Sequence, residues 1–138
     1  MRRALFMTLA LLVGACAQIP ETGQEMADKK MEPVPGKAVV YIVQGPFPEY
    51  AAGIAFDDGG GVTMWPGSFY RWVTTPGTHT IRSSEGRFNA LIKLQLEAGK
   101  LYFVEHWTAG GFGTTTSTGL QVVDDEIGRQ LVRSGRMN

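Results

Sequence analysis

The chain has 138 residues, of which 13 are basic and 13 are acidic, so its formal net charge is zero, and 43% of its residues are hydrophobic. A chain of this length supports one domain with a real hydrophobic core. The lack of a basic excess argues against a nucleic-acid-binding protein, since such proteins use positive charge to neutralise phosphates. The single cysteine excludes intramolecular disulfides and thiolate metal clusters, so burial must supply the stability.

The first fifteen residues are typical of a secretory signal peptide. Arg2 and Arg3 precede an apolar run over residues 4–13, which closes on small residues before Cys16. This run is about half as long as the roughly 20 residues that a membrane-spanning helix needs. The sequence VGAC at residues 13–16 resembles the lipobox of bacterial lipoproteins, in which the cysteine is acylated and becomes the new N-terminus. We therefore expect a signal peptide over residues 1–15 and lipidation at Cys16.

A second interpretation of the same residues stays open. Ala15-Cys16-Ala17 also fits an A-x-A cleavage site, and cleavage after Ala17 would release a soluble periplasmic protein. Lipidation is favoured because an unpaired free thiol is a liability in an oxidising compartment. In lipoproteins of enteric type, an aspartate after the cysteine favours retention in the inner membrane. The chain has Ala17 at this position, so resemblance to that group implies the outer membrane. We expect anchoring by acyl chains, such as palmitate, to the inner face of the bacterial outer membrane.

Residues 16–36 have the composition of a flexible tether. Polar and charged side chains dominate, and Pro20, Pro33 and Pro35 interrupt the segment. A short helical turn over residues 23–30 is compatible with the sequence, but no apolar face would hold it in place. A flexible coil of this length reaches on the order of 25 Å. The folded domain, residues 37–138, would then stand clear of the lipid headgroups.

From residue 37 onward the pattern is that of a β protein. The clearest single signal is the strict alternation of apolar and polar residues over 90–97, which predicts a strand with one buried face. Residues 101–108 are apolar on both faces, so we expect a central strand there. β-Branched and aromatic runs between glycine- and proline-rich turns predict further short strands over 38–43, 52–56, 62–65, 69–74, 78–83 and 120–123.

The C-terminal part of the chain predicts a flexible loop and then a helix. Residues 110–119 contain mostly glycine and threonine, so we expect a flexible, low-complexity segment. Asp124 is a good N-cap, Ile127 and Leu131 share one helix face, and Gly135 can end the helix. We predict a mainly β fold, a small antiparallel β-sandwich of about seven or eight short strands with one C-terminal α-helix.

Four segments carry a resemblance to a known family: AVVY at 38–41, PGSFY at 66–70, PGTHTI at 76–81 and LQLEAGKLYF at 94–103. Together they resemble one family of small bacterial envelope proteins, often lipoproteins, that carry the domain of unknown function 2846. The resemblance spans roughly residues 37–134, and it implies a transthyretin-like or PEGA-like β-sandwich with no established activity. The glycine- and threonine-rich stretch at 110–119 departs from the family's usual pattern.

The residues that could carry chemistry do not form a catalytic or metal-binding pattern. His79 and His106 are the only histidines, and no third ligand lies at a recognisable spacing. Glu105 adjoins His106 but points to the opposite face of a strand. Residues 57–59 fit a turn better than a calcium loop, and Ser68 lacks the motif that presents a nucleophile. We expect structural roles for both histidines and a protein that has no enzymatic activity, cofactor or metal.

Aromatic residues supply the remaining candidates for a contact surface. In a strand over residues 69–74, Phe69 would face the core, whereas Tyr70 and Trp72 would be either exposed or covered by a helix or loop. Covering is the favoured alternative, because a small sandwich buries its aromatic side chains wherever it can. If exposed, Tyr70, Trp72 and Phe112 would be the candidate contacts with an envelope protein or a glycan.

The expected function is that of a non-enzymatic binding or accessory module of the cell envelope. Two alternatives stay open at this point. The first is a purely structural or stress-related envelope lipoprotein without a specific ligand. The second is a small envelope hydrolase that uses His79 or His106 with a carboxylate brought close by folding.

Overall fold

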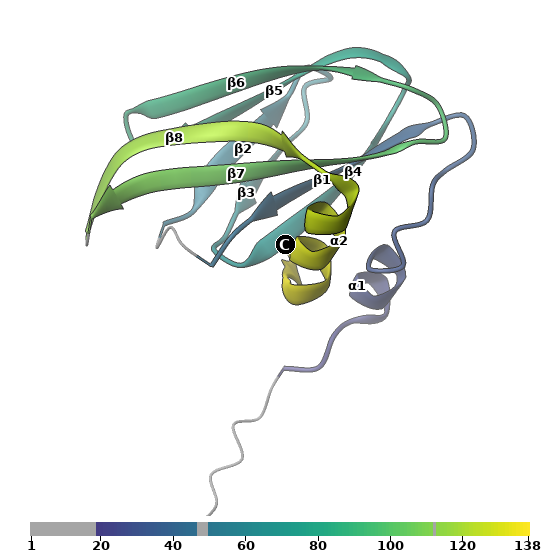
Figure 1. Ribbon diagram of the computed structural model, residues 1–138, viewed down its shortest axis with the longest axis horizontal. Coiled ribbons are helices and arrows are strands. Elements are labelled where there is room, and N and C mark those ends of the chain that lie inside the picture. Colours follow the sequence, from purple (N-terminus) through teal and green to yellow (C-terminus); the bar gives the residue numbers. More distant parts are fainter. Residues whose placement is uncertain (1–18, 47–49, 112) are drawn as a thin grey trace, which may run out of the picture.

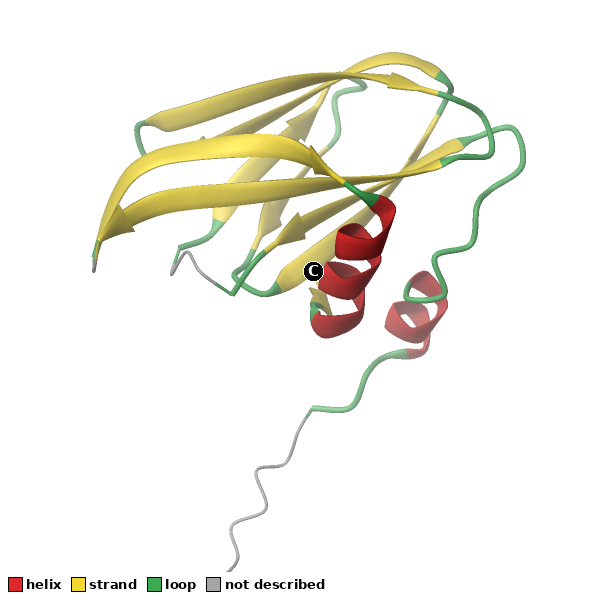
Figure 2. Ribbon diagram, in the orientation of Figure 1, coloured by secondary structure: helices red, strands yellow, loops and turns green. Residues whose placement is uncertain are grey.

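Two β-sheets pack face to face, and two helices lie against the outer face of one of them (Figures 1 and 2). The computed structural model describes residues 19–46, 50–111 and 113–138. The predicted mainly β fold with sandwich-like packing and a C-terminal helix is confirmed. The predicted signal peptide and the lipidation residue Cys16 lie outside the described residues.

The first sheet has five strands and is mixed rather than antiparallel. Its central strand, residues 38–44, pairs in parallel with the strand at residues 101–111. The two-residue C-terminal strand, residues 136–137, is also parallel to its partner, residues 68–74. The prediction of a purely antiparallel sandwich is therefore wrong for this sheet. The parallel pairing agrees with the burial of the central strand, residues 38–44, on both of its faces, which is typical of parallel sheets. The strand order is β8 (Thr114–Val123), β7 (Leu101–Gly111), β1 (Ala38–Gln44), β4 (Ser68–Thr74) and β9 (Arg136–Met137).

The second sheet has four strands, all antiparallel, in the order β3 (Gly61–Met64), β2 (Ala52–Phe56), β5 (Gly77–Glu85) and β6 (Phe88–Leu96). The alternation predicted for residues 90–97 is confirmed, because Leu94 and Leu96 are buried while Lys93 and Gln95 are exposed. Nine strands are found among the described residues, slightly more than the seven or eight expected.

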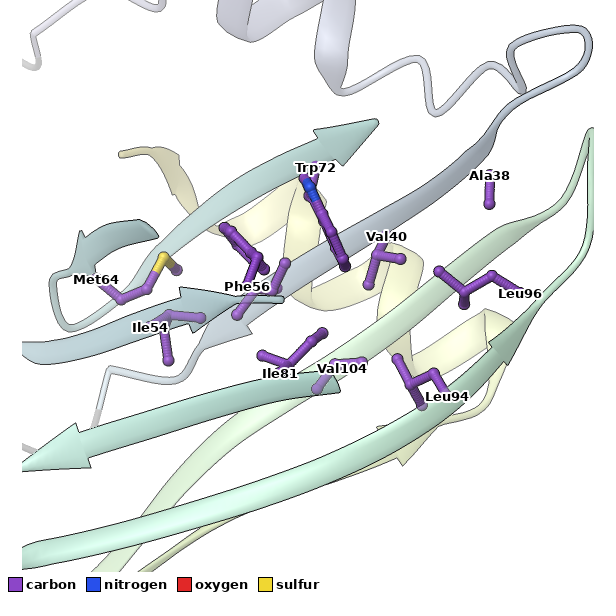
Figure 3. Packing of buried hydrophobic residues seen from close by; sticks show 11 residues of the cluster. Ala38, Val40, Ile54, Phe56, Met64, Trp72, Ile81, Leu94, Leu96 and Val104 are labelled. Carbon is purple, nitrogen blue, oxygen red and sulfur yellow. The ribbon is translucent and has the colours of Figure 1, made fainter. Parts of the chain in front are cut away.

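The main hydrophobic core lies between the two sheets (Figure 3). Trp72 from β4 stacks on Phe56 from β2, with ring centroids 4.3 Å apart, so that one aromatic pair joins the two sheets. Burying a large apolar side chain contributes roughly 1.5–3 kcal/mol. The other buried members of this core are Ala38, Val40, Ile42, Ile54, Met64, Ile81, Leu94, Leu96 and Val104.

A second core lies between the outer face of the five-stranded sheet and the helices. Helix α2 (Asp125–Ser134) begins as predicted, since the Asp124 side chain accepts a hydrogen bond from the Ile127 N–H at 2.8 Å. Gly135 ends the helix, and its N–H donates to the Leu131 carbonyl at 2.9 Å.

The face of α2 that packs on the sheet differs from the predicted one. Ile127 is 48% exposed, whereas Gly128 and Val132 are buried. A Cβ atom at Gly128 would lie 2.1 Å from Cγ of Phe103 on β7. The glycine therefore lets the helix approach the sheet closely, and this approach turns Ile127 toward solvent.

The N-terminal segment, residues 19–36, also differs from the predicted flexible tether. Helix α1 (Gly23–Asp28) is capped by Thr22, whose hydroxyl accepts from the Glu25 N–H at 3.0 Å. Beyond the helix, Met31 is buried in the second core beside the side chains of β1. Ion pairs and a single buried methionine hold this segment, and neither produces the apolar periodicity that a sequence search detects.

The glycine- and threonine-rich stretch forms a hairpin rather than a flexible loop. Strand β7 runs to Gly111 and β8 starts at Thr114, with a register shift at Ala109/Gly110. Gly119 lies opposite Trp107, and a Cβ atom there would lie 2.3 Å from the indole ring. The glycine thus makes room for a tryptophan that covers the neighbouring strand.

Candidate functional site

The outer face of the four-stranded sheet carries a groove of about 560 Å³ over β2, β5 and β6. The groove is open because β2 contributes only the small residues Gly53 and Ala55 to this face. A Cβ atom at Gly53 would lie 3.0 Å from the Ser84 hydroxyl, so a larger residue would fill the floor. The groove is lined by Gly53, Ile54, Ala55, Arg82, Ser83, Ser84, Asn89, Ala90 and Leu91.

Strand register places the polar groups of the groove in two cross-strand rows. Ser84 pairs with Gly53 on one side and with Asn89 on the other, and Arg82 is paired in the same way between Ala55 and Leu91. The side chains of Arg82, Ser84 and Asn89 make no hydrogen bond or ion pair with the part of the chain that the structure describes. One cation, one hydroxyl and one amide are therefore open to a ligand, next to the exposed side chain of Leu91.

His79 forms a carboxylate pair away from this groove. Its Nδ1 lies 3.0 Å from Oδ1 of Asp57, and its Nε2 lies 2.8 Å from the carbonyl oxygen of Thr75. The hydrogen bond from His79, together with one from the Thr80 N–H, holds the pKa of the Asp57 carboxyl below its ordinary value. Both ring nitrogens therefore take part in fixing a turn. This geometry supports the structural role expected for His79.

His106 is enclosed between the sheets. The residue is 0% exposed, and its Nε2 lies 2.7 Å from the hydroxyl of Thr118, which in turn donates to the Trp107 carbonyl at 3.1 Å. Its Nδ1 has no hydrogen-bond partner among the described residues. Burial lowers the pKa of His106 to about 4, so the imidazole is neutral at neutral pH. A solvent-inaccessible histidine in this position supports a structural role as well.

Two of the aromatic residues proposed as contacts face the main core. Trp72 is 5% exposed, and its Nε1 donates to Oδ2 of Asp58 at 3.1 Å. Tyr70 is half-buried and stacks against Phe56, with ring centroids 5.9 Å apart. The covering element is the four-stranded sheet, rather than the helix or loop that we expected. Phe112, the third proposed contact, lies outside the described residues.

The opposite face of β4 belongs to the second core. Phe69 is fully buried there and lies near Tyr41, with ring centroids 6.3 Å apart. Val73, which strand alternation places on the same face as Phe69, is 39% exposed. The strand is thus apolar on both faces because helices cover one face and a sheet covers the other.

An ionic cluster attaches α1 to the five-stranded sheet and to β9. Glu25 is 2% exposed, and its Oε1 lies 3.2 Å from Nζ of Lys29 and 3.4 Å from Nε of Arg136. The Tyr41 hydroxyl donates to the Asp28 carbonyl at 2.7 Å, and burial raises the pKa of this hydroxyl. Because a buried carboxylate needs charged partners, these contacts hold the segment in one position.

Sequence reasoning missed the groove residues Arg82, Ser84, Asn89 and Leu91. One signal was present: Leu91 is an apolar residue on the otherwise polar, outward face of the alternating strand. The small residues of β2 form part of a groove only because β2 pairs with β5. This pairing joins residues far apart in the chain, so the local sequence pattern does not predict it.

In residues 19–46, 50–111 and 113–138, no cluster of three or more histidine, cysteine, aspartate or glutamate side chains could hold a metal ion. Neither described helix has the length and hydropathy of a membrane span. No protein-family model and no curated protein matches the chain. The resemblance to proteins with the domain of unknown function 2846 therefore stays a prediction.

Proposed function

We propose that this chain is a lipid-anchored, non-enzymatic module of the bacterial cell envelope that binds another envelope component in the groove of its four-stranded sheet. Residues 1–15 would serve as the signal peptide, and acylated Cys16 would hold the protein at the inner face of the outer membrane. The observation that carries the proposal is the groove itself. Its Arg82, Ser84 and Asn89 side chains have no partner within the described part of the chain, and the described helices pack on the other sheet.

The chemistry of the groove favours a ligand that accepts hydrogen bonds and carries a negative charge. Arg82 offers a guanidinium, which binds carboxylates in bidentate fashion, and Ser84 and Asn89 add neutral hydrogen-bonding groups. The volume of the groove lies within the range that binds small ligands. We propose a carboxylate-bearing glycan fragment, such as a soluble peptidoglycan fragment, as the ligand.

The positions of both histidines favour a binding module over a hydrolase. His79 has both ring nitrogens engaged in a turn, and His106 is sealed between the sheets. Neither lines the groove. A general base must come within hydrogen-bond reach of its substrate, and these two positions do not offer that reach to a ligand in the groove.

The proposal is tested by titrating soluble peptidoglycan fragments into residues 16–138, which include every described residue, while amide chemical shifts are followed. We expect shifts confined to β2, β5 and β6. Arg82→Gln should weaken binding by about tenfold, the equivalent of one charge-assisted hydrogen bond. Lys93→Gln is the matched control, because Lys93 is exposed on the same sheet but outside the groove.

The control decides how a loss of binding is interpreted. Equal weakening by Arg82→Gln and Lys93→Gln would show non-specific charge attraction and contradict the groove as the site. Absence of any binding at millimolar concentrations would also contradict the proposed glycan ligand. The protein would then be better described as a structural lipoprotein or as a module that binds an envelope protein.

A further inference from the structure

The described chain is attached to the domain from Pro20 onward, which leaves little free length after Cys16. The Pro20 carbonyl accepts a hydrogen bond from Nη2 of Arg136 at 3.4 Å, and α1 begins three residues later. Four residue steps separate Cys16 from Pro20, which corresponds to at most about 14 Å of extended chain. An anchor at Cys16 would therefore hold the domain next to the bilayer, instead of on a tether of about 25 Å.

The surface next to Pro20 is formed by the C-terminal strand and the turn between β3 and β4. The Arg136 N–H donates to the Gly67 carbonyl at 2.9 Å, and the Trp65 N–H donates to Oδ1 of Asn138 at 3.3 Å. These bonds place the turn at residues 65–67 directly against β9, whose Arg136 holds Pro20. The attachment point of the chain and the Trp65 turn thus belong to one end of the sandwich.

This end exposes two large apolar side chains, Ile19 at 79% and Trp65 at 61%. A tryptophan is amphipathic and is enriched at the level of the lipid headgroups, where its ring is partly buried and its N–H stays hydrated. The side chain of Arg136, which also pairs with Glu25, is 48% exposed, and a guanidinium is able to contact lipid phosphates. An exposed tryptophan close to the point where an acylated chain would enter the membrane has the chemistry of an interfacial contact.

We propose that this end of the sandwich, formed by Ile19, the Trp65 turn and β9, lies on the phospholipid surface, with Trp65 inserted among the headgroups. The inference rests on the proposed anchor at Cys16. Strands β5 and β6 lie on the far side of the molecule from helix α1 of the N-terminal segment (Figure 1). The groove is then directed away from the membrane, toward the periplasm and its glycan.

The test uses residues 16–138 coupled through the Cys16 thiol to a maleimide phospholipid. The coupled protein is placed in vesicles of phosphatidylethanolamine and phosphatidylglycerol that contain lipids brominated near the headgroup end of the acyl chain. Bromine quenches tryptophan fluorescence only at short range. We expect strong quenching of the native protein and loss of most of that quenching in Trp65→Phe. Of the other two tryptophans, Trp72 is buried in the core and Trp107 is half-buried against Gly119 of β8.

Two further variants make the result specific for orientation. Leu91→Trp places a new indole in the groove, and its added fluorescence should remain unquenched. Glu25→Ala removes the carboxylate whose ion pair with Arg136 holds α1, and it should reduce quenching by lengthening the free chain. Quenching that is unchanged in Trp65→Phe, or that acts equally on the Leu91→Trp indole, would overturn the proposed orientation.

Because Cys16 is coupled to the lipid chemically, the outcome of this test does not depend on acylation in the cell or on binding in the groove. A failure of the quenching test with the anchor covalently in place would refute the orientation and leave lipidation and groove binding untouched. The intact mass of the mature protein, by contrast, tests acylation at Cys16 directly, and a mass without acyl chains would refute the native anchor.

Discussion

The buried histidine predicts a specific loss of stability in mild acid. The folded pKa of His106 is about 4, whereas the ordinary value is 6.5, and the shift comes from burial alone. In the window between these values the unfolded chain binds the proton and the folded chain does not. The stability contributed by neutral His106 is therefore fully present above about pH 6.5 and is lost as the pH falls toward 4. A shift of this size corresponds to about 3 kcal/mol.

Urea unfolding of the native protein and of His106→Gln, measured from pH 7 to pH 4, tests this prediction. Glutamine does not titrate, and its amide retains a group that can bond to the Thr118 hydroxyl. We expect the free energy of unfolding of the native protein to fall by about 3 kcal/mol more than that of the variant over this range. The comparison uses the pH dependence alone, because the substitution itself changes packing at pH 7.

Other titrating groups do not obscure the comparison. The pKa of Asp57 is lowered, so its contribution is present above its ordinary pKa and is lost only as the pH falls through a value below 3.8. This loss occurs in both proteins and cancels in the difference. Identical pH dependence in the native protein and in His106→Gln would show that His106 is accessible or paired when the protein is folded, and would refute the reasoning.

Two further predictions concern the helices. In Gly128→Ala, the added methyl group would lie 2.1 Å from the Phe103 ring, and the overlap should outweigh the roughly 1 kcal/mol gain in helix propensity. We expect a lower Tm than in the exposed control Ile127→Ala, and an unchanged or higher Tm would contradict the close approach. Glu25→Ala leaves Arg136 without its carboxylate, while Lys29 keeps Glu21, and it should cost about 1–3 kcal/mol, with faster hydrogen exchange over residues 20–31. The exposed control Glu32→Ala should leave exchange in that segment unchanged, and equal rates in both variants would show that Glu25 does not hold α1.

Features that depend on local chemistry were predictable from the sequence. The strand over residues 90–97 shows its buried face by simple alternation, and the Asp124 cap is followed by acidic residues that suit a helix N-terminus. Turn residues such as Gly59, Gly67 and Gly77 adopt positive φ angles, which is why glycine marks these positions. Each of these signals involves residues within a few positions of one another.

Features that depend on long-range pairing were not predictable in the same way. The parallel pairing of β1 with β7 joins residues about sixty positions apart, and an apolar strand gives no indication of its partner or its direction. Docking of α1 depends on Glu25 meeting Arg136, and a glutamate in a polar segment normally indicates a solvated surface. The groove likewise needs Gly53 beside Ser84, which only the sheet register brings together.

The division of the two sheet faces explains why the candidate site lies where it does. Tyr41, Phe69 and Phe103 make the outer face of the five-stranded sheet apolar, and α2 with the N-terminal segment must cover it. The four-stranded sheet needs no such cover, because its outward residues other than Leu91 are small or polar. A binding surface can therefore develop on that sheet without exposing the core. If the chain is anchored at Cys16, the N-terminal segment that covers the five-stranded sheet also connects the domain to the membrane. The helices and the anchor would then lie on one side of the molecule, and the groove would lie on the other.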